Sequence, residues 1–81
     1  MMDQIREIVA RQSGLAVDIA TLDDGADLYE AGMTSFASVY LMLGLEEAFD
    51  VEFPDAMLTR KTFASLRAIA EAVSKLSAQA A

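Results

Sequence analysis

The first apolar residues of the chain recur with the spacing of one helical face. That face collects Ile5, Ile8, Val9 and Gln12. Asp3 is a favoured residue type for capping a helix, and Ser13-Gly14 supplies a stop signal. The pattern predicts a first helix of about three turns between these two signals.

The middle of the chain holds its densest run of apolar residues. Of the fourteen residues from Phe36 to Phe49, ten are apolar. We predict a second helix from Thr34-Ser35 to Phe49. Because apolar residues are too numerous for a helix with one buried face, this helix either lies at the centre of the fold or presents an apolar face to partners.

Two further helical segments are predicted in the last third of the chain. Pro54-Asp55 starts a short helical turn that runs to Leu58 or Thr59, with the aspartate as its cap. Thr62 is the predicted cap of the last helix. One face of that helix carries the apolar residues Phe63, Leu66, Ile69, Ala70, Val73 and Leu76. Residues 77–81 are expected to form a frayed tail.

A long segment, from Leu15 to Met33, separates the first two helices. It is rich in Asp and Gly, yet it carries regularly placed aliphatic residues. These are Leu15, Val17, Ile19, Leu22 and Leu28. A loop of this length in a small domain is expected to be functional or attached to the core. We predict that these aliphatic side chains attach it by packing into the core. The pattern predicts an all-α single domain over residues 1–81, with three main helices, one short helix and a long first loop.

Composition narrows the classes of function. The 81 residues are 54% apolar, which is enough for a core, and they include neither cysteine nor histidine. Disulfides, thiolate catalysis and Ser-His chemistry are therefore excluded, and an enzyme is not expected. The acidic loop does not match a calcium-binding EF-hand, because Ala20, Leu22 and Ala31 fall at ligand positions. We predict no metal site.

The net charge of −7 also bears on partners. Five acids lie in residues 18–30 and five more in residues 46–55, with no base in either segment. Such a surface disfavours nucleic acids and anionic membranes and favours basic partner proteins. Solvated loops and helix ends explain the same runs equally well. Without a signal peptide pattern or a membrane-spanning run, a cytoplasmic monomer is expected.

Candidate chemistry is confined to the segment Gly32-Met33-Thr34-Ser35-Phe36. Its two hydroxyl residues, Thr34 and Ser35, lie at the predicted start of the second helix. Taken alone, either hydroxyl could serve simply as a helix cap. Thr34 suffices for that role, which leaves Ser35 in the first turn near the exposed end. A phosphate esterified to its oxygen would meet free N–H groups and the positive end of the helix dipole.

Three stretches of the chain resemble acyl carrier proteins. Residues 27–36, DLYEAGMTSF, are similar to the family's segment ending in Gly-x-Asp-Ser-Leu. Residues 45–55, LEEAFDVEFPD, and residues 62–66, TFASL, resemble its later motifs. The resemblance implies a four-helix fold and a 4′-phosphopantetheine arm on Ser35. It also implies three kinds of partner: a phosphopantetheinyl transferase, a ligase that loads the arm, and enzymes that accept the cargo.

The chain departs from the family pattern around this serine. Thr34 stands where the family usually has Asp, Phe36 replaces Leu, and Ala37 and Tyr40 occupy positions that are often acidic in fatty-acid carriers. Residues 33–39 and 58–63 are instead similar to small carriers charged with amino acids by synthetase-like ligases. We therefore expect a small cargo, an amino acid such as glycine or alanine.

A partner-facing surface is predicted along the second helix. Its residues are Thr34, Phe36, Tyr40, Leu43, Glu46 and Glu47, and burial of Met42 or Leu43 in the core is the alternative for that part of the helix. The alternative hypothesis for the whole chain is a carrier-like interaction module that never receives an arm.

Overall fold

The computed structural model describes residues 1–15 and 18–80, with side chains up to residue 78. Three helices, α1 (Met2–Gln12), α2 (Ser35–Phe49) and α3 (Leu66–Ala80), make up most of it. Two single turns of 3-10 helix, η1 (Ile19–Thr21) and η2 (Asp55–Met57), lie between them. The described residues contain no strand, and the predicted all-α architecture is confirmed, with the short fourth helix formed as a 3-10 turn.

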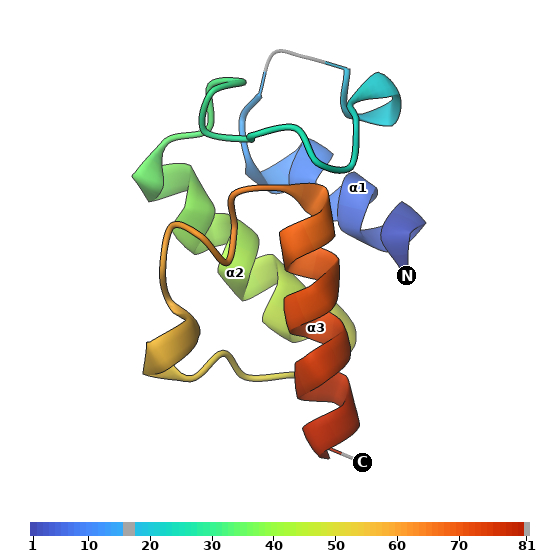
Figure 1. Ribbon diagram of the computed structural model, residues 1–81, viewed down its shortest axis with the longest axis vertical. Helices are drawn as coiled ribbons and strands as arrows, with labels where there is room; N and C mark the ends of the chain where they lie inside the picture. The colour runs from blue at the N-terminus through green and yellow to red at the C-terminus, as the bar shows by residue number, and fades with distance from the viewer. Residues whose placement is uncertain (16–17, 81) are drawn as a thin grey trace.

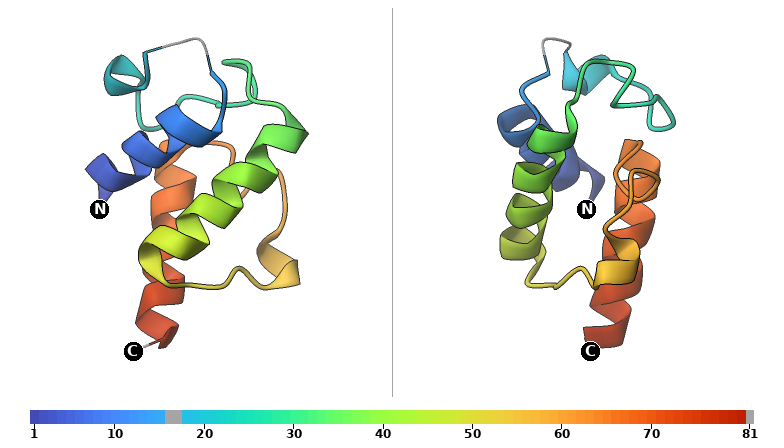
Figure 2. Two further views of the ribbon diagram at one scale, coloured as in Figure 1. Left: turned by 180° about the vertical axis from the view of Figure 1, so that it is seen from behind. Right: turned by 90° about the vertical axis from the view of Figure 1, so that its left-hand side faces the viewer.

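The helices meet around one apolar core. In Figures 1 and 2, the segment that contains η2 runs from the lower end of α2 back up to the start of α3, while α1 and the long loop lie toward the upper end. The core is built from Ile5, Ile8, Val9, Ile19, Leu28, Met33, Leu41, Leu45, Phe53, Phe63, Leu66, Ile69, Ala72, Val73 and Leu76. Burial of each large apolar side chain contributes about 1.5–3 kcal/mol. The apolar faces predicted for the first and last helices are thus the faces that pack.

Gly44 of α2 allows α1 to approach closely. A Cβ atom placed on this residue would lie 3.2 Å from Cγ2 of Ile8 and 3.3 Å from Cγ of Gln12. Both distances are shorter than ordinary van der Waals contacts, so a larger residue would push the helices apart. Glycine therefore spares Ile8 and Gln12 a shift of a few tenths of an ångström at this helix crossing, despite its low helix propensity.

Three predicted helix starts were wrong. The first helix begins at Met2, so Asp3 lies in its first turn and does not cap it. The aspartate of η2 is also inside the turn, and Pro54 precedes it without a side-chain bond. The last helix begins at Leu66, where the Oγ of Ser65 accepts a hydrogen bond from the N–H of Ala68 at 3.0 Å.

The reason for the later start of α3 is a separate turn before it. Thr62 lies 3.1 Å, oxygen to oxygen, from the hydroxyl of Thr59, and its N–H donates to the carbonyl of Thr59. Its side chain is therefore used inside this turn. At the other end, α3 continues to Ala80, so residues 77–80 are helical where the sequence predicted a frayed tail. Residue 81 lies outside the described residues.

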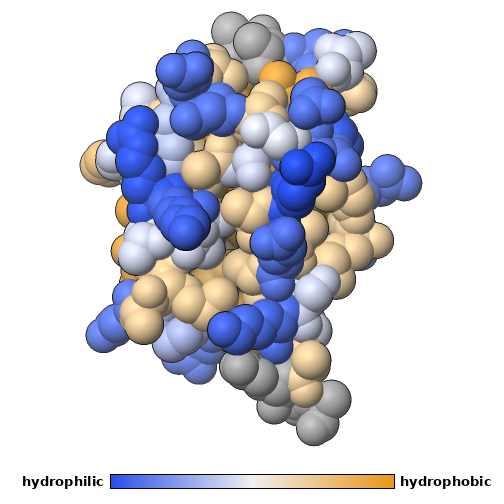
Figure 3. Space-filling view, in the orientation of Figure 1, coloured by the Kyte–Doolittle hydropathy of each residue, from blue (hydrophilic) through white to orange (hydrophobic). Residues whose placement is uncertain are grey.

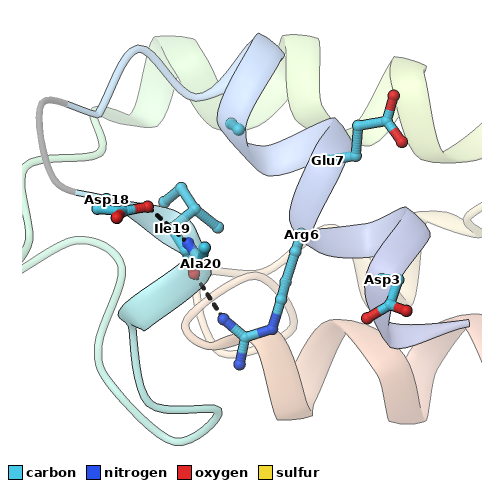
Figure 4. A pocket seen from close by; sticks show the side chains of 7 residues that line it. Asp3, Arg6, Glu7, Asp18, Ile19 and Ala20 are labelled. Carbon is cyan, nitrogen blue, oxygen red and sulfur yellow. Dashed lines mark hydrogen bonds between the residues drawn. The ribbon is translucent and has the colours of Figure 1, made fainter.

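The long loop is held in place by a side chain from α1. Arg6 donates hydrogen bonds from Nη1 to the carbonyls of Ile19 and Leu22, at 2.6 and 2.9 Å, and its Nη2 pairs with the carboxylate of Asp24. Figure 4 shows the guanidinium reaching from α1 to η1. The sequence missed η1, which Asp18 caps by accepting from the N–H of Ala20 at 3.0 Å.

Apolar pins and backbone bonds complete the attachment of this loop. Ile19 and Leu28 are buried and Leu22 is partly buried, as predicted, whereas Val17 lies outside the described residues. The N–H of Leu28 donates to the carbonyl of Ala64 at 2.7 Å, and the N–H of Arg67 donates to the carbonyl of Asp24 at 2.9 Å. The loop is thereby fastened to α1 on one side and to the start of α3 on the other.

We predict that Arg6→Met lowers the free energy of unfolding by about 2–3 kcal/mol, because two loop carbonyls lose a charged donor and Asp24 loses its partner. Urea denaturation measures this difference. Arg11→Met is the matched control, since Arg11 is exposed near the other end of α1. Equal losses of stability in the two variants would contradict the proposed role of Arg6.

None of the helices within residues 1–15 and 18–80 combines the length and apolar content needed to span a bilayer.

Candidate functional site

The start of α2 is shaped by the three residues that precede it. Gly32 has a φ of 120°, which L-residues rarely adopt, and the next residue, Met33, is buried. Thr34 is extended, and its Oγ1 accepts a hydrogen bond from the N–H of Ala37 at 3.0 Å. The prediction that Thr34 caps the second helix is confirmed. The chain therefore turns sharply out of the loop and enters α2 with its cap already satisfied.

Ser35 is the first residue of α2 and is exposed. Its hydroxyl is not needed for capping, because Thr34 performs that function. One turn later, the hydroxyl of Ser38 donates to the carbonyl of Ser35 at 2.6 Å. The first turn of α2 contains no acidic residue, and the first N–H groups of a helix have no acceptor within the helix. An anion esterified to Ser35 would thus meet a favourable dipole and no nearby acid of this turn.

An apolar strip extends along α2 from this serine. Phe36, Val39, Tyr40 and Leu43 are 72%, 52%, 51% and 51% exposed, and we call these four residues the α2 strip. They line a shallow apolar hollow of about 310 Å³. The rings of Phe36 and Tyr40 lie 5.6 Å apart, centroid to centroid. Large apolar residues exposed together in this way commonly mark a binding surface.

The second helix has one buried apolar face and one exposed apolar face. Leu41 and Leu45 are fully buried, so α2 is central to the core, while the α2 strip faces outward. Leu43 is exposed and Met42 is partly buried against the core, which answers the question left open for these two residues. Val39 was missed, although its spacing of three after Phe36 and four before Leu43 could have identified it.

The polar members of the predicted docking surface have different surroundings. Glu47 is exposed and lies one turn beyond Leu43, where it lines a hollow between α1 and α2 with Arg11. Thr34 is used as the helix cap. Glu46 is partly buried, and its Oε2 accepts a hydrogen bond from the N–H of Phe53 at 2.9 Å. Of the two glutamates, Glu47 is therefore the one whose charge remains at the surface.

Glu46 stabilises the exit from α2. The helix ends at Phe49, the next residue, Asp50, has a φ of 52°, and the following segment folds back so that the N–H of Phe53 meets the glutamate. We predict that Glu46→Ala lowers the free energy of unfolding by about 1–2 kcal/mol, because a partly buried N–H loses its charged acceptor. Glu46→Gln, which keeps an acceptor oxygen, should lose less. Thermal denaturation of both variants tests this, and equal losses would contradict it.

A small apolar groove lies between α2 and the segment that precedes α3. It is lined by Ser38, Val39, Met42, Leu58 and Phe63 and holds about 120 Å³. The ring of Phe63 is buried against that of Phe53, with centroids 5.4 Å apart, so this wall is anchored in the core. The groove is smaller than the hollow of about 310 Å³ along the α2 strip.

The sequence and the fold define a carrier domain, and comparisons with known proteins agree. A family model for the phosphopantetheine attachment site matches residues 3–73, so the chain belongs to the phosphopantetheine-binding carrier proteins. Within that family, this chain is similar in sequence to aminoacyl carrier proteins. It is 59% identical over 69 residues to the aminoacyl carrier protein of Agrobacterium fabrum, covering 85% of this chain and 83% of the relative.

A second relative and two solved structures extend the comparison. Aminoacyl carrier protein 1 of Bradyrhizobium diazoefficiens is 34% identical over 61 residues, or 75% of this chain and 64% of the relative. A carrier protein from Agrobacterium tumefaciens, crystallised with an engineered Bradyrhizobium japonicum glycine:[carrier protein] ligase and AMP, superposes with a TM-score of 0.89. It is 57% identical, over 91% of this chain and 99% of that one. A solution structure from Agrobacterium tumefaciens gives a TM-score of 0.74 at 53% identity, with both chains fully covered. The predicted carrier family and fold are confirmed.

Proposed function

We propose that this protein carries aminoacyl groups as thioesters on a 4′-phosphopantetheine arm attached to the oxygen of Ser35. The observation that carries the proposal is the position of Ser35, exposed as the first residue of α2 directly after an independent cap, within the part of the chain that matches the family. The chain has no cysteine, so the thiol for a thioester must come from the attached arm.

The protein's own residues supply position and exposure. A partner transferase would join the Ser35 oxygen to the phosphorus of coenzyme A's pantetheine phosphate, with release of the adenosine bisphosphate part and loss of the serine proton. Thr34 keeps α2 ordered up to this residue, and the absence of an acid from the first turn avoids repulsion of the bound phosphodiester. A separate ligase would then load the thiol, so the chain itself performs no catalysis.

The structure favours a small, polar cargo that stays in solvent. An aminoacyl thioester carries an ammonium group, and burying it without a partner is costly. The groove beside Ser38 is small, and its lining is mainly apolar, from Val39, Met42, Leu58 and Phe63. The similar carrier protein of known structure was crystallised with an engineered glycine:[carrier protein] ligase. We therefore propose an amino acid as cargo, with glycine as the first candidate.

A charging experiment tests this cargo. Holo-protein should be incubated with ATP and an amino acid:[carrier protein] ligase, with glycine, alanine or fatty acids supplied separately, and the intact mass measured. We expect a mass increase of one aminoacyl group with glycine or alanine, and loss of that increase after hydroxylamine treatment. Charging with fatty acids alone, by an acyl ligase, would overturn the choice of cargo.

We further propose that the ligase docks on the α2 strip. The strip begins one residue after Ser35, so an enzyme seated on it would have the arm beside it. Its apolar residues would supply most of the affinity, and the charge of Glu47 at its far end would help to orient a basic partner surface. A docking patch of only four apolar residues suits the monomeric cytoplasmic carrier that we propose, because such a carrier must bind and leave several enzymes.

A further inference from the structure

One side-chain contact ties together the two loops at the Ser35 end of the molecule. The guanidinium carbon of Arg60 lies 4.1 Å from the centre of the Tyr29 ring, a cation–π contact. Tyr29 belongs to the long loop before α2, and Arg60 belongs to the segment between η2 and α3. The face of the molecule shown in Figure 3 carries hydrophilic side chains beside apolar surface.

The segment that carries Arg60 also forms one wall of the small groove. Leu58 and Phe63, on either side of Arg60 in the sequence, both line that groove opposite α2. Between them, the backbone bonds mainly to itself: the N–H of Thr62 donates to Thr59, and that of Phe63 donates to Arg60. Phe63 anchors one end of the wall in the core, whereas Leu58 at the other end is 44% exposed. The contact with Tyr29 therefore restrains the middle of a wall that has one loose end.

Tyr29, the partner of Arg60 in this contact, is attached to the core of the fold. Tyr29 follows Leu28, which is fully buried and whose N–H donates to the carbonyl of Ala64 at 2.7 Å. The N–H of Tyr29 itself donates to the carboxylate of Asp27 at 2.9 Å. Because Tyr29 is held in this way, its contact with Arg60 opposes an outward movement of the groove wall.

We propose that Tyr29 and Arg60 are specificity-determining residues that keep the groove closed to apolar acyl chains. This inference rests on the proposed function, because it concerns a cargo carried on the Ser35 arm. With the contact formed, the groove remains at about 120 Å³ and cannot shelter a medium-length acyl chain. With the contact broken, the wall from Leu58 to Arg60 can move away from α2 and the groove can admit the chain.

The effect can be measured with two cargoes on holo-protein. Acetyl and octanoyl groups are introduced with the arm, from their coenzyme A thioesters and a promiscuous phosphopantetheinyl transferase, and the rate of thioester cleavage by hydroxylamine is followed by intact mass. We expect Arg60→Met and Tyr29→Leu to slow cleavage of the octanoyl form by up to about two- to fivefold, the upper limit set by the equilibrium effect of losing an exposed cation–π contact. Cleavage of the acetyl form should be unchanged.

Three matched variants separate the contact from general charge or ring effects. Tyr29→Phe keeps the aromatic face and should behave as wild type. Lys61→Met removes the same charge from the neighbouring exposed residue and should also behave as wild type. The double variant of Tyr29→Leu and Arg60→Met should match the single variants, because each removes the same contact. Unchanged octanoyl cleavage in Arg60→Met, or an equal effect of Lys61→Met, would overturn the proposal.

A second measurement on apo-protein keeps this inference distinct from the proposed function. Amide hydrogen exchange at Leu28 and Phe63 should accelerate about two- to fivefold in Arg60→Met and not in Lys61→Met. If wild-type protein never accepts an arm, the proposed function fails, and unchanged exchange in Arg60→Met separately overturns the restraint. If the arm is accepted and neither exchange nor octanoyl cleavage changes, the proposed function stands and the role of Tyr29 and Arg60 is rejected.

Discussion

Ser35→Ala is expected to abolish modification of the protein completely. Wild-type chain incubated with coenzyme A and a phosphopantetheinyl transferase should gain the mass of one phosphopantetheine, and the variant should gain none. Its fold should persist, because Thr34 caps α2 through the N–H of Ala37 and Ser35 takes no part in that cap. Intact-protein mass spectrometry and circular dichroism measure the two properties together.

Ser38→Ala is the matched control for the loss of a hydroxyl. Ser38 lies one turn after Ser35 and donates to its carbonyl, so the substitution perturbs the same turn without removing the proposed acceptor. This variant should be modified. A gain of mass by Ser35→Ala, through Thr34 or Ser38, would contradict the assignment of Ser35. An unmodified wild-type protein with several active transferases would instead support an interaction module without an arm.

The second large effect is expected on the α2 strip. Leu43→Asp should reduce the kcat/KM of aminoacylation by the ligase about 30-fold or more, the loss typical of a central interface residue. Leu43 is 51% exposed and makes up part of the apolar hollow with Phe36 and Tyr40, so a carboxylate there would be desolvated on docking. Steady-state kinetics with holo-protein as the varied substrate measure the loss.

Two variants test whether this loss belongs to docking. Ala10→Asp adds the same charge to an exposed position of α1 and should leave the kinetics within about twofold of wild type. Glu47→Lys should mainly slow association and weaken the dependence of the rate on salt. A Leu43→Asp protein that is charged at the wild-type rate would show that the ligase docks elsewhere.

Features that depend on neighbours in the sequence were predicted well. The cap formed by Thr34 needs only an N–H three residues later, so the residue type and its position were sufficient. The choice of Ser35 as the attachment residue came from the family motif, because local chemistry alone left a purely capping role open. The helix faces of α1 and α3 were also correct, because each has polar residues on the opposite side and a clear period.

The helix ends were less predictable because several residues could serve as caps. Thr62 and Ser65 are both good capping types, and the difference between them arises from the turn that uses the hydroxyls of Thr59 and Thr62. Asp3 likewise has a suitable side chain, but the helix already begins one residue before it. Capping preference names the candidates, and backbone geometry selects among them.

For this protein the sequence by itself determined the helical class and the cap at Thr34, because each depends on residues within a few positions of one another, and its resemblance to a family motif indicated the serine proposed to bear the arm. Only the tertiary structure decided which side of α2 faces solvent, since its own apolar residues occur on every side and the sequence pattern favours no side for burial. It also decided that Glu46 binds Phe53, that Arg6 holds the long loop, and that Arg60 meets Tyr29. These contacts join residues from 7 to 31 positions apart, and their partners are set by the packing of the whole chain.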